Sequence, residues 1–471
     1  MSTDLTPDLC ILGGGAGGVS LALGAAACDL SVVLIEKASL GGRRLTHSVP
    51  RNALLAAIGK VTDLGVGAKE TEIDFARIRD HIASVVAAIG PNYTQSRLEA
   101  LNIRVIRAAG RFTGPDTCEA RGLKIKARRF VVATGAVEKS PPIPGLDLVR
   151  PFDCAALCAL SQPPRCFIII GADPEGLVLA QAMRRIGSVV IVILESKLFS
   201  SEDEELAAPV RAAFARDGIV IHEGTRITRI EPRGEGVCVF VAAAGHEKPI
   251  TGSHIWVAAG CAPVVEGLGL AEAKVRYDEQ GIKTRAGFAT SNRRIHALGT
   301  VVRGAQYDGA AEQHASVVLG AILGLPGVRI RTQPATRVIL TCPPIAVTGL
   351  SETRARAEYR RIHVLRWPFA ETERAQIEQR PAGHVKLLAS RRGTLLGAGI
   401  VGPGAEELIN LCALAISKGV TARDIASMMV SYPALGDAAR RAAIMFPANR
   451  LGYSLTQQML RFLRWLREGL P

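Results

Sequence analysis

The sequence predicts an α/β protein with two Rossmann-like dinucleotide-binding domains followed by a C-terminal α+β domain. An apolar strand at 9–12 runs into the turn Gly13-Gly14-Gly15-Ala16-Gly17-Gly18, and a second strand at 32–35 ends at Glu36. The same order of strand, turn, helix, strand and acid returns at 166–195. After Pro334 the pattern changes to strands with helices between them. The repeated unit is typical of doubly wound parallel sheets.

The first glycine turn has the spacing of a dinucleotide fingerprint in its full context. Gly13 permits the tight turn, Gly15 lets the backbone approach a pyrophosphate at the helix N-terminus, and Gly18 allows close packing of helix on strand. Glu36 stands where an acid accepts hydrogen bonds from a ribose. Because strand, helix and acid agree, we predict a bound dinucleotide here and not merely a structural turn.

The second turn keeps the outer glycines of the fingerprint, Gly171 and Gly176, but places Asp173 at the middle position. Asp173 adds a side chain and a negative charge beside any bound pyrophosphate, so we expect weakened nicotinamide cofactor binding unless the loop is displaced. If a dinucleotide binds, Glu195 would accept a hydrogen bond from its ribose and repel a ribose phosphate, which favours NADH over NADPH. An exposed acid at a strand end is the alternative interpretation of Glu195.

The remaining segments place the domain boundaries. A helix is expected at 75–89, and a strand leading to a glycine at 130–135 has echoes at 255–260 and 295–299. The cluster Pro141, Pro142, Pro144 and Gly145 makes a stiff exit from the first domain. We expect the first nucleotide domain to be discontinuous. The expected boundaries are 1–150 and 260–332 for the first domain, 151–259 for the second, 333–446 for the third, and 447–471 for a basic amphipathic helix.

Composition fits a multidomain globular enzyme. The 471 residues are 48% hydrophobic, which is ample for buried parallel sheets. The net charge of +14 favours anionic partners without selecting one, and since no recognition module is visible we expect no nucleic-acid binding. The ten cysteines form no CxxC pair, so we predict no metal site. Without a signal peptide or a membrane-spanning run, a cytoplasmic location is expected.

These motifs resemble the pyridine nucleotide-disulfide oxidoreductases over nearly the whole chain. The resemblance rests on the two dinucleotide loops, on Ala133-Thr134-Gly135 followed by Pro144-Gly145, on 201–204 before a helix, and on 408–416 leading to Tyr432-Pro433. The most similar branch contains the mercuric-reductase-like and dihydrolipoyl-dehydrogenase-like flavoproteins.

The resemblance implies FAD in the first domain, NAD(P)H in the second, and a C-terminal interface domain that forms homodimers. For FAD it implies contacts at Gly13, Gly15, Gly18, Glu36, Gly42, Gly110, Thr134, Gly135 and Thr300. For NAD(P) it implies contacts at Gly171, Gly176 and Glu195. Thr300 stands where the family carries an acid for the FAD ribityl chain, and Cys261 replaces an arginine.

The family's redox helix is where this chain departs. That helix would begin after Gly41-Gly42 with two cysteines, but no cysteine lies between Gly41 and Leu55. Since the thiolate is the reactive species, disulfide reduction through this helix is excluded. The family's Lys and Glu beside the flavin are also missing, and Asn52 and Val178 stand in their places. Replacing both members of a buried ion pair can be neutral or favourable, which indicates a rebuilt flavin pocket.

Tyr432 and Asp437 align with the His and Glu that shuttle protons to the thiols in the family. A tyrosine donates a hydrogen bond at neutral pH but is a poor base. We interpret Tyr432 and Asp437 as candidates for an acceptor site, and a tyrosine packed in the dimer interface is the alternative.

Our leading hypothesis is an FAD-dependent oxidoreductase, driven by NAD(P)H, that passes electrons from flavin directly to a quinone, a small molecule or a protein. The alternative is a degenerate homologue that acts as a scaffold. It is suggested by Asp173, Thr300 and Cys261, which replace the residues that the family carries at these positions. Dihydrolipoyl or mercuric reductase activity requires the absent cysteines. The tail at 454–470 predicts a basic amphipathic helix that either touches a membrane surface or docks on the dimer.

Overall fold

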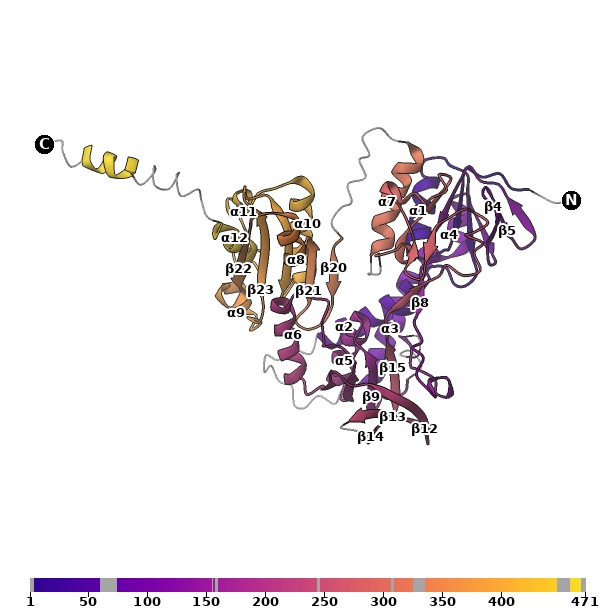
Figure 1. Cartoon of the computed structure of the whole chain (residues 1–471), viewed down its shortest axis with the longest axis horizontal. Helices are drawn as coiled ribbons and strands as arrows, with labels where there is room; N and C mark the ends of the chain where they lie inside the picture. The colour runs from indigo at the N-terminus through magenta and orange to yellow at the C-terminus, as the bar shows by residue number, and fades with distance from the viewer. Residues whose placement is uncertain are drawn as a thin grey trace. The chain divides into compact units, whose positions relative to one another are not determined.

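The computed structural model describes residues 4–59, 74–154, 156, 160–243, 246–305, 309–324, 335–446 and 458–466. The chain forms two compact units, one of residues 1–200 and 214–332 and the other of residues 201–213 and 333–471. Each unit has its own sheets and core, with elements labelled in Figure 1.

The first sheet of unit 1 is parallel and has five strands. Their order is β19 (Ile295–Ala297), β7 (Arg129–Val132), β1 (Leu9–Leu12), β2 (Val32–Glu36) and β3 (Ile103–Arg107). Strand β1 is buried along its full length and pairs with β2 and β7, which explains its uninterrupted apolar run. Helices α1 (Ala16–Ala26) and α7 (Ala310–Leu323) pack against each other beside this sheet (Figure 1).

The chain leaves this sheet through three excursions. After β2 come a π-helical turn at Arg44–Ser48, α2 (Val49–Gly59), α3 (Phe75–Ile89) and α4 (Gln95–Ala100). A small antiparallel sheet is built from β4 (Arg111–Gly114), β5 (Thr117–Ala120) and β6 (Leu123–Ile125). Strand β8 (Ala136–Glu138) pairs with β16 (Cys261–Pro263), so the outgoing and returning chains run side by side. A short hairpin, β17 (Tyr277–Asp278) and β18 (Gly281–Ile282), precedes β19.

A second parallel sheet lies between β8 and β16 in the chain. Its order is β11 (Val220–His222), β10 (Val189–Ile193), β9 (Cys166–Gly171) and β15 (His254–Ala258), and α5 (Pro174–Arg185) packs against it. An antiparallel sheet of β12 (Ile227–Arg233), β13 (Gly236–Ala243) and β14 (His246–Gly252) completes this part. The sequence prediction of two dinucleotide-type sheets is therefore confirmed.

Unit 2 contains an antiparallel sheet of five strands. The order is β20 (Arg337–Ile339), β21 (Ile345–Gly349), β24 (Leu395–Val401), β23 (His384–Ser390) and β22 (Ile362–Pro368). Helix α10 (Ala405–Lys418) packs on β21 and β24, and α12 (Asp437–Ile444) packs on β22 and β23. Helices α8 (Glu352–Glu358), α9 (Glu373–Ile377) and α11 (Ala422–Ala426) fill the connections. This is the predicted α+β domain.

Residues 458–466 form a short helix whose residues are all exposed. The rest of the predicted tail, 447–457 and 467–471, lies outside the described residues. None of the helices in the described ranges is long and apolar enough to cross a bilayer.

A buried lysine ties the start of α6 (Glu204–Arg216) to the sheet of unit 2. Lys386 on β23 is 3% exposed, and its ammonium lies 2.6 Å from Asp203, 2.7 Å from Glu352 and 3.1 Å from Glu205. Burial works against the charge of Lys386, but these hydrogen bonds outweigh it and raise its pKa. Arg366 also binds Glu205, and this hydrogen bond lowers the pKa of Glu205 to about 2 despite its partial burial.

We expect Lys386→Met to lower the free energy of unfolding by about 1.5–3 kcal/mol, because it removes the hydrogen bonds of one buried ammonium to three partly buried carboxylates, of which Glu205 keeps Arg366 and Glu352 keeps Arg356. Lys283→Met is the matched control: its ammonium lies 3.1 Å from Asp278, its side chain is 49% exposed, and a loss below about 1 kcal/mol is expected. Urea unfolding of the full chain at neutral pH measures both. Equal losses in the two variants would contradict the prediction.

Candidate cofactor-binding site

The outer glycines of the first loop are required by close backbone contacts. Gly13 has φ +110°, and a Cβ added there would lie 2.3 Å from the carbonyl oxygen of Ala133. A Cβ on Gly18 would lie 1.9 Å from the carbonyl oxygen of Gly13. Any side chain at either position would therefore push α1 away from β1 and β7, as the fingerprint predicts.

The middle glycine faces open space. A Cβ on Gly15 would meet no heavy atom within 4 Å. Glu36, at the end of β2, accepts a hydrogen bond from the backbone N–H of Gly14 in this loop at 2.5 Å and another from that of Ala38, just beyond β2, at 2.6 Å. A free approach to the backbone beside a fixed acid suits the pyrophosphate and ribose of a dinucleotide, so these residues fit FAD.

The other residues predicted for FAD lie around this loop in two groups. Gly42 follows Gly41, whose N–H donates to the carbonyl of Gly14 at 2.8 Å, and a Cβ on Gly42 would lie 3.3 Å from the Cα of Gly15. Gly110 packs against Ile35 at the end of β2.

The second group comes from the segments that follow β7 and β19. Gly135 has φ +73°, and a Cβ there would lie 3.7 Å from the hydroxyl of Thr300. Thr134 donates its hydroxyl to the carbonyl of Val264 at 2.8 Å, so this side chain holds the strand connection together. Thr300 is half-buried. The structure thus brings Gly135 and Thr300 together.

In the second loop, Asp173 fills the place that the first loop leaves open. Its carboxylate caps α5 and accepts hydrogen bonds from the N–H of Gly176 at 2.7 Å and of Gly260 at 3.2 Å. Burial raises the pKa of Asp173 to about 6, against the stabilising effect of these two donors. A helix N-terminus of this kind is where a pyrophosphate would bind, so the carboxylate occupies the anion position itself.

The outer glycines of this loop keep their structural roles. A Cβ on Gly171 would lie 2.3 Å from the carbonyl oxygen of Ala258, and one on Gly176 would lie 2.4 Å from the Ala258 Cβ. Glu195 follows β10 and is exposed. The loop therefore retains the dinucleotide architecture, while the arrangement of Asp173 does not fit a bound pyrophosphate.

A cluster of ion pairs occupies the segment that lacks the cysteines. Arg43 contacts Glu175 of α5 at 2.9 Å and Glu138 of β8 at 3.4 Å. Arg51 of α2, which is 6% exposed, contacts the other oxygen of Glu175 at 3.3 Å. His47 contacts Glu138 at 3.3 Å, and this hydrogen bond lowers the pKa of Glu138 although burial opposes it. The next residue, Arg44, pairs with Glu312 of α7.

The sequence motifs did not predict this cluster. The resemblance places a Lys and a Glu at the positions of Asn52 and Val178, and both charges are lost there. The structure pairs Arg51 with Glu175 instead, one residue earlier in α2 and three residues earlier in α5. Glu175 and Val178 are three residues apart in α5 and therefore share a helix face. The glutamate one turn before the expected position, together with the arginine next to Asn52, was the sequence signal for this pair.

Two thiols lie near the same charges but are not activated. Burial raises the pKa of Cys154 to about 12 and that of Cys261 to about 11. Both are therefore thiols at neutral pH and poor nucleophiles. In the parts of the chain that the structure describes, no group of three or more His, Cys, Asp and Glu side chains is placed to hold a metal ion.

The two residues predicted for catalysis, Tyr432 and Asp437, lie in unit 2. Tyr432 is 80% exposed. Burial opposes the charge of Asp437, but hydrogen bonds from Arg441 and Arg440 outweigh it and hold its pKa below the ordinary value. The carboxylate of Asp437 thus binds its own helix.

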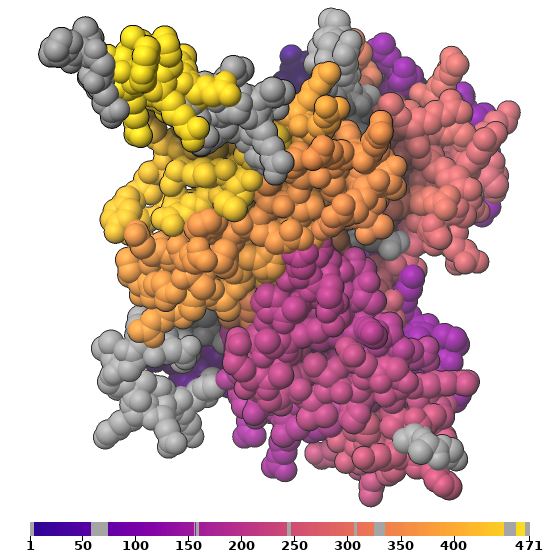
Figure 2. Space-filling view, turned by 60° about the vertical axis from the view of Figure 1, so that its left-hand side comes forward, coloured from indigo at the N-terminus to yellow at the C-terminus, as the bar shows by residue number. Residues whose placement is uncertain are grey.

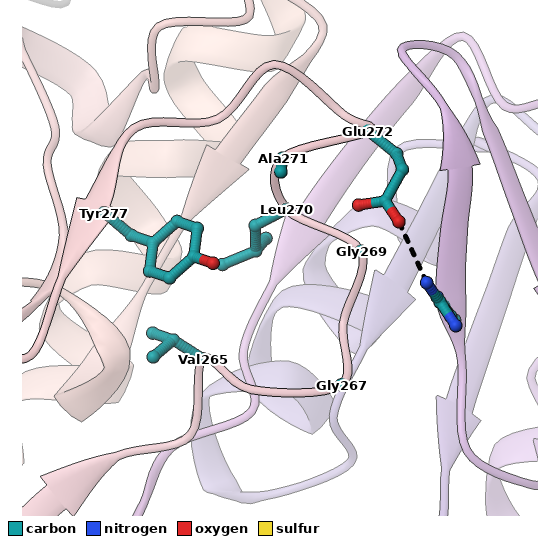
Figure 3. Close-up of a pocket in the computed structure, with 8 residues that line it drawn as sticks. Val265, Gly267, Gly269, Leu270, Ala271, Glu272 and Tyr277 are labelled. Atoms are coloured by element: carbon teal, nitrogen blue, oxygen red, sulfur yellow. Dashed lines mark hydrogen bonds and ion pairs between the residues drawn. The ribbon is translucent and has the colours of Figure 1, made fainter.

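A pocket in unit 1 contains none of the predicted site residues (Figure 3). An ion pair of 2.9 Å between Arg111 and Glu272 lies on one side of it, and Tyr277 lies on the other. Its lining comes from β4 and the loop before β17, so it is separate from both glycine loops.

Comparison with known proteins shows the family of the chain. Residues 7–316 match the family described as pyridine nucleotide-disulphide oxidoreductase, and residues 335–443 match its dimerisation domain. A dihydrolipoyl dehydrogenase from Thermus scotoductus is 30% identical over 451 residues, which cover 93% of this chain and 97% of that protein. A mercuric reductase from Lysinibacillus sphaericus is 27% identical over 93% of this chain and 82% of that protein.

Solved structures show the same fold. LpdA from Mycobacterium tuberculosis superimposes with a TM-score of 0.83 at 24% identity, covering 94% of this chain and all 100% of that one. The flavoprotein disulfide reductase RclA from Escherichia coli, in its Cu(II) complex, gives 0.82 at 21% identity over 93% of this chain and 100% of that one. Members of the family are FAD-dependent, use NAD(P)H and form homodimers through the C-terminal domain. This chain belongs to the pyridine nucleotide-disulphide oxidoreductase family.

Proposed function

We propose that this protein is an FAD-dependent oxidoreductase that passes electrons from flavin directly to an acceptor, without a redox disulfide. The observation that carries the proposal is the contrast between the two ends of one segment. At one end the N–H of Gly41 donates to the carbonyl of Gly14 in the first loop, whereas at the other end Arg43 and Arg51 form ion pairs where the resemblance implies thiols.

FAD, when bound, supplies a two-electron store. Residues of this chain would hold it as follows: the loop at Gly15 receives the pyrophosphate, and Glu36 binds the ribose of the adenosine part. Thr300, beside Gly135, offers a neutral hydroxyl to the ribityl chain. The acceptor in this proposal is a quinone, a small molecule or a protein.

In this proposal the second loop binds NADH only weakly. NADH would have to displace the carboxylate of Asp173 from the N–H groups of Gly176 and Gly260 before its pyrophosphate could bind α5. Glu195 stands at the end of the second strand of that domain and favours NADH over NADPH.

Anaerobic stopped-flow mixing with NADH tests the proposal. We expect the flavin absorbance to bleach at roughly 1 to 1,000 per second at saturating NADH, and then to return when menadione is added without any dithiol present. A coloured protein that neither NADH nor NADPH bleaches would contradict the reductase proposal. A colourless protein that added FAD does not stabilise would favour the scaffold alternative, since saturating ligand should raise the melting temperature.

Asp173→Gly should tighten NADH binding at least about tenfold, equivalent to about 1.4 kcal/mol, because it frees the helix N-terminus and removes a negative charge. The NADH dependence of flavin bleaching gives the affinity. Asp74→Gly is the matched control, because Asp74 caps α3 in the same way through the N–H of Arg77. Glycine replaces an acidic N-cap at a small loss of stability. Unchanged NADH affinity in Asp173→Gly would refute the role of Asp173.

We also propose that the helix at 458–466 rests on an anionic membrane surface. Met459, Phe462, Leu463 and Leu466 share one side at helical spacing, and Arg461 and Arg464 lie opposite. Phe462 is 56% exposed, and its ring stacks on Trp465. The helix is the yellow segment between grey ones in Figure 2. An exposed apolar face combined with arginines matches a surface of anionic lipids.

Co-sedimentation with vesicles checks this proposal. The full chain should pellet with vesicles that contain phosphatidylserine and remain soluble with pure phosphatidylcholine, whereas a chain ending at Phe446 should pellet with neither. Identical pelleting of the two chains would contradict membrane contact. A loss of the dimer in the shortened chain on gel filtration would show that the helix docks on the dimer instead.

A further inference from the structure

His47 is held from both sides of its ring inside the ion-pair cluster. Its Nδ1 lies 2.6 Å from the hydroxyl of Thr46, and its Nε2 lies 3.3 Å from a carboxylate oxygen of Glu138. The hydroxyl of Thr46 also lies 3.3 Å from the carbonyl oxygen of Gly42. The side chain of His47 is 18% exposed, so the imidazole is oriented by its neighbours and still reaches water.

This network satisfies the imidazole in both of its protonation states. In the neutral ring, Nε2–H donates to Glu138 and the Thr46 hydroxyl donates to Nδ1. When the ring gains a proton, Nδ1–H donates to the Thr46 oxygen, and the hydroxyl turns to donate to the Gly42 carbonyl. Because only a hydroxyl has to rotate, His47 can gain and lose a proton without any side chain leaving its place.

The segment that carries His47 lies between the two glycine loops. On one side Gly41 binds Gly14 of the first loop through a hydrogen bond of 2.8 Å. On the other side Arg43 binds Glu175, in the first turn of the helix that follows the second loop. The segment that carries His47 therefore connects the first glycine loop to the helix that follows the second.

We propose that His47 is the proton donor to the electron acceptor, an inference that rests on the proposed function. Bound FAD, once reduced, would supply the hydride, and His47 would supply the proton, so that a two-electron acceptor A becomes AH2 and the imidazole of His47 is left neutral. Water returns the proton to His47, while Glu138 keeps the ring in position.

The charged groups around His47 support this assignment. Glu138, on β8, stays ionised because its hydrogen bond with His47 lowers its pKa against the effect of burial. Arg43 contacts the same Glu138 oxygen, and Arg51 shares Glu175 with Arg43. The neighbouring Arg44 is paired with Glu312. Arg51 and Arg44 thus have carboxylate oxygens of their own, whereas Arg43 and His47 share one oxygen of Glu138.

The experiment compares His47→Gln with His246→Gln, which makes the same change at an exposed histidine of β14. Both proteins are reduced anaerobically with dithionite, so NADH is not needed, and are mixed with menadione between pH 5 and 9. General acids contribute roughly 100- to 10,000-fold. We expect His47→Gln to slow flavin reoxidation by an amount in this range at low pH and to abolish its pH dependence, with His246→Gln unchanged.

A second measurement needs no turnover. In the oxidised wild type we expect the flavin absorption band to shift as His47 gains its proton, and this shift should disappear in His47→Gln and remain in His246→Gln. A wild-type pH profile together with a wild-type spectral titration in His47→Gln would overturn the proposal. If menadione oxidises none of the reduced proteins, the proposed function fails, and the spectral titration still decides whether His47 titrates beside the flavin.

Discussion

The pairing of Arg43 and Arg51 with Glu175 is the interaction on which the site depends. It joins the segment after the first glycine loop to the first turn of the helix after the second loop, in a position where a lone charge would be costly. Glu138 extends the pairing to the strand that connects the two sheets. Where the resemblance implies a cysteine pair and a Lys–Glu pair, this chain has one connected set of ion pairs.

Much of the fold could be predicted from local patterns. Glycines 13 and 18 have their roles because of backbone contacts within one strand–turn–helix unit, so spacing alone was sufficient. The parallel strands were visible as short apolar runs because both of their faces are buried. The C-terminal domain was predicted from the change of pattern after Pro334.

The ion pairs could not be predicted in the same way. Arg43, Glu138 and Glu175 come from three separate segments, and only the folded chain brings them together. The buried Lys386 is a similar case, because its partners Asp203 and Glu352 lie far from it in sequence. For Asp437 the resemblance predicted a place in an acceptor site and gave no indication that Arg440 and Arg441 would bind its carboxylate.

Asp173 acts in the second loop as an intramolecular competitor of any bound dinucleotide. Its carboxylate is covalently attached to the anion position, so its effective concentration there is set by the chain and does not change with the cell's supply of nucleotide. A free dinucleotide competes against that fixed concentration, and its apparent affinity falls by the fraction of time that the loop is vacated. The consequence is a raised apparent dissociation constant, so that a larger nucleotide pool would be needed to fill the same fraction of the loop.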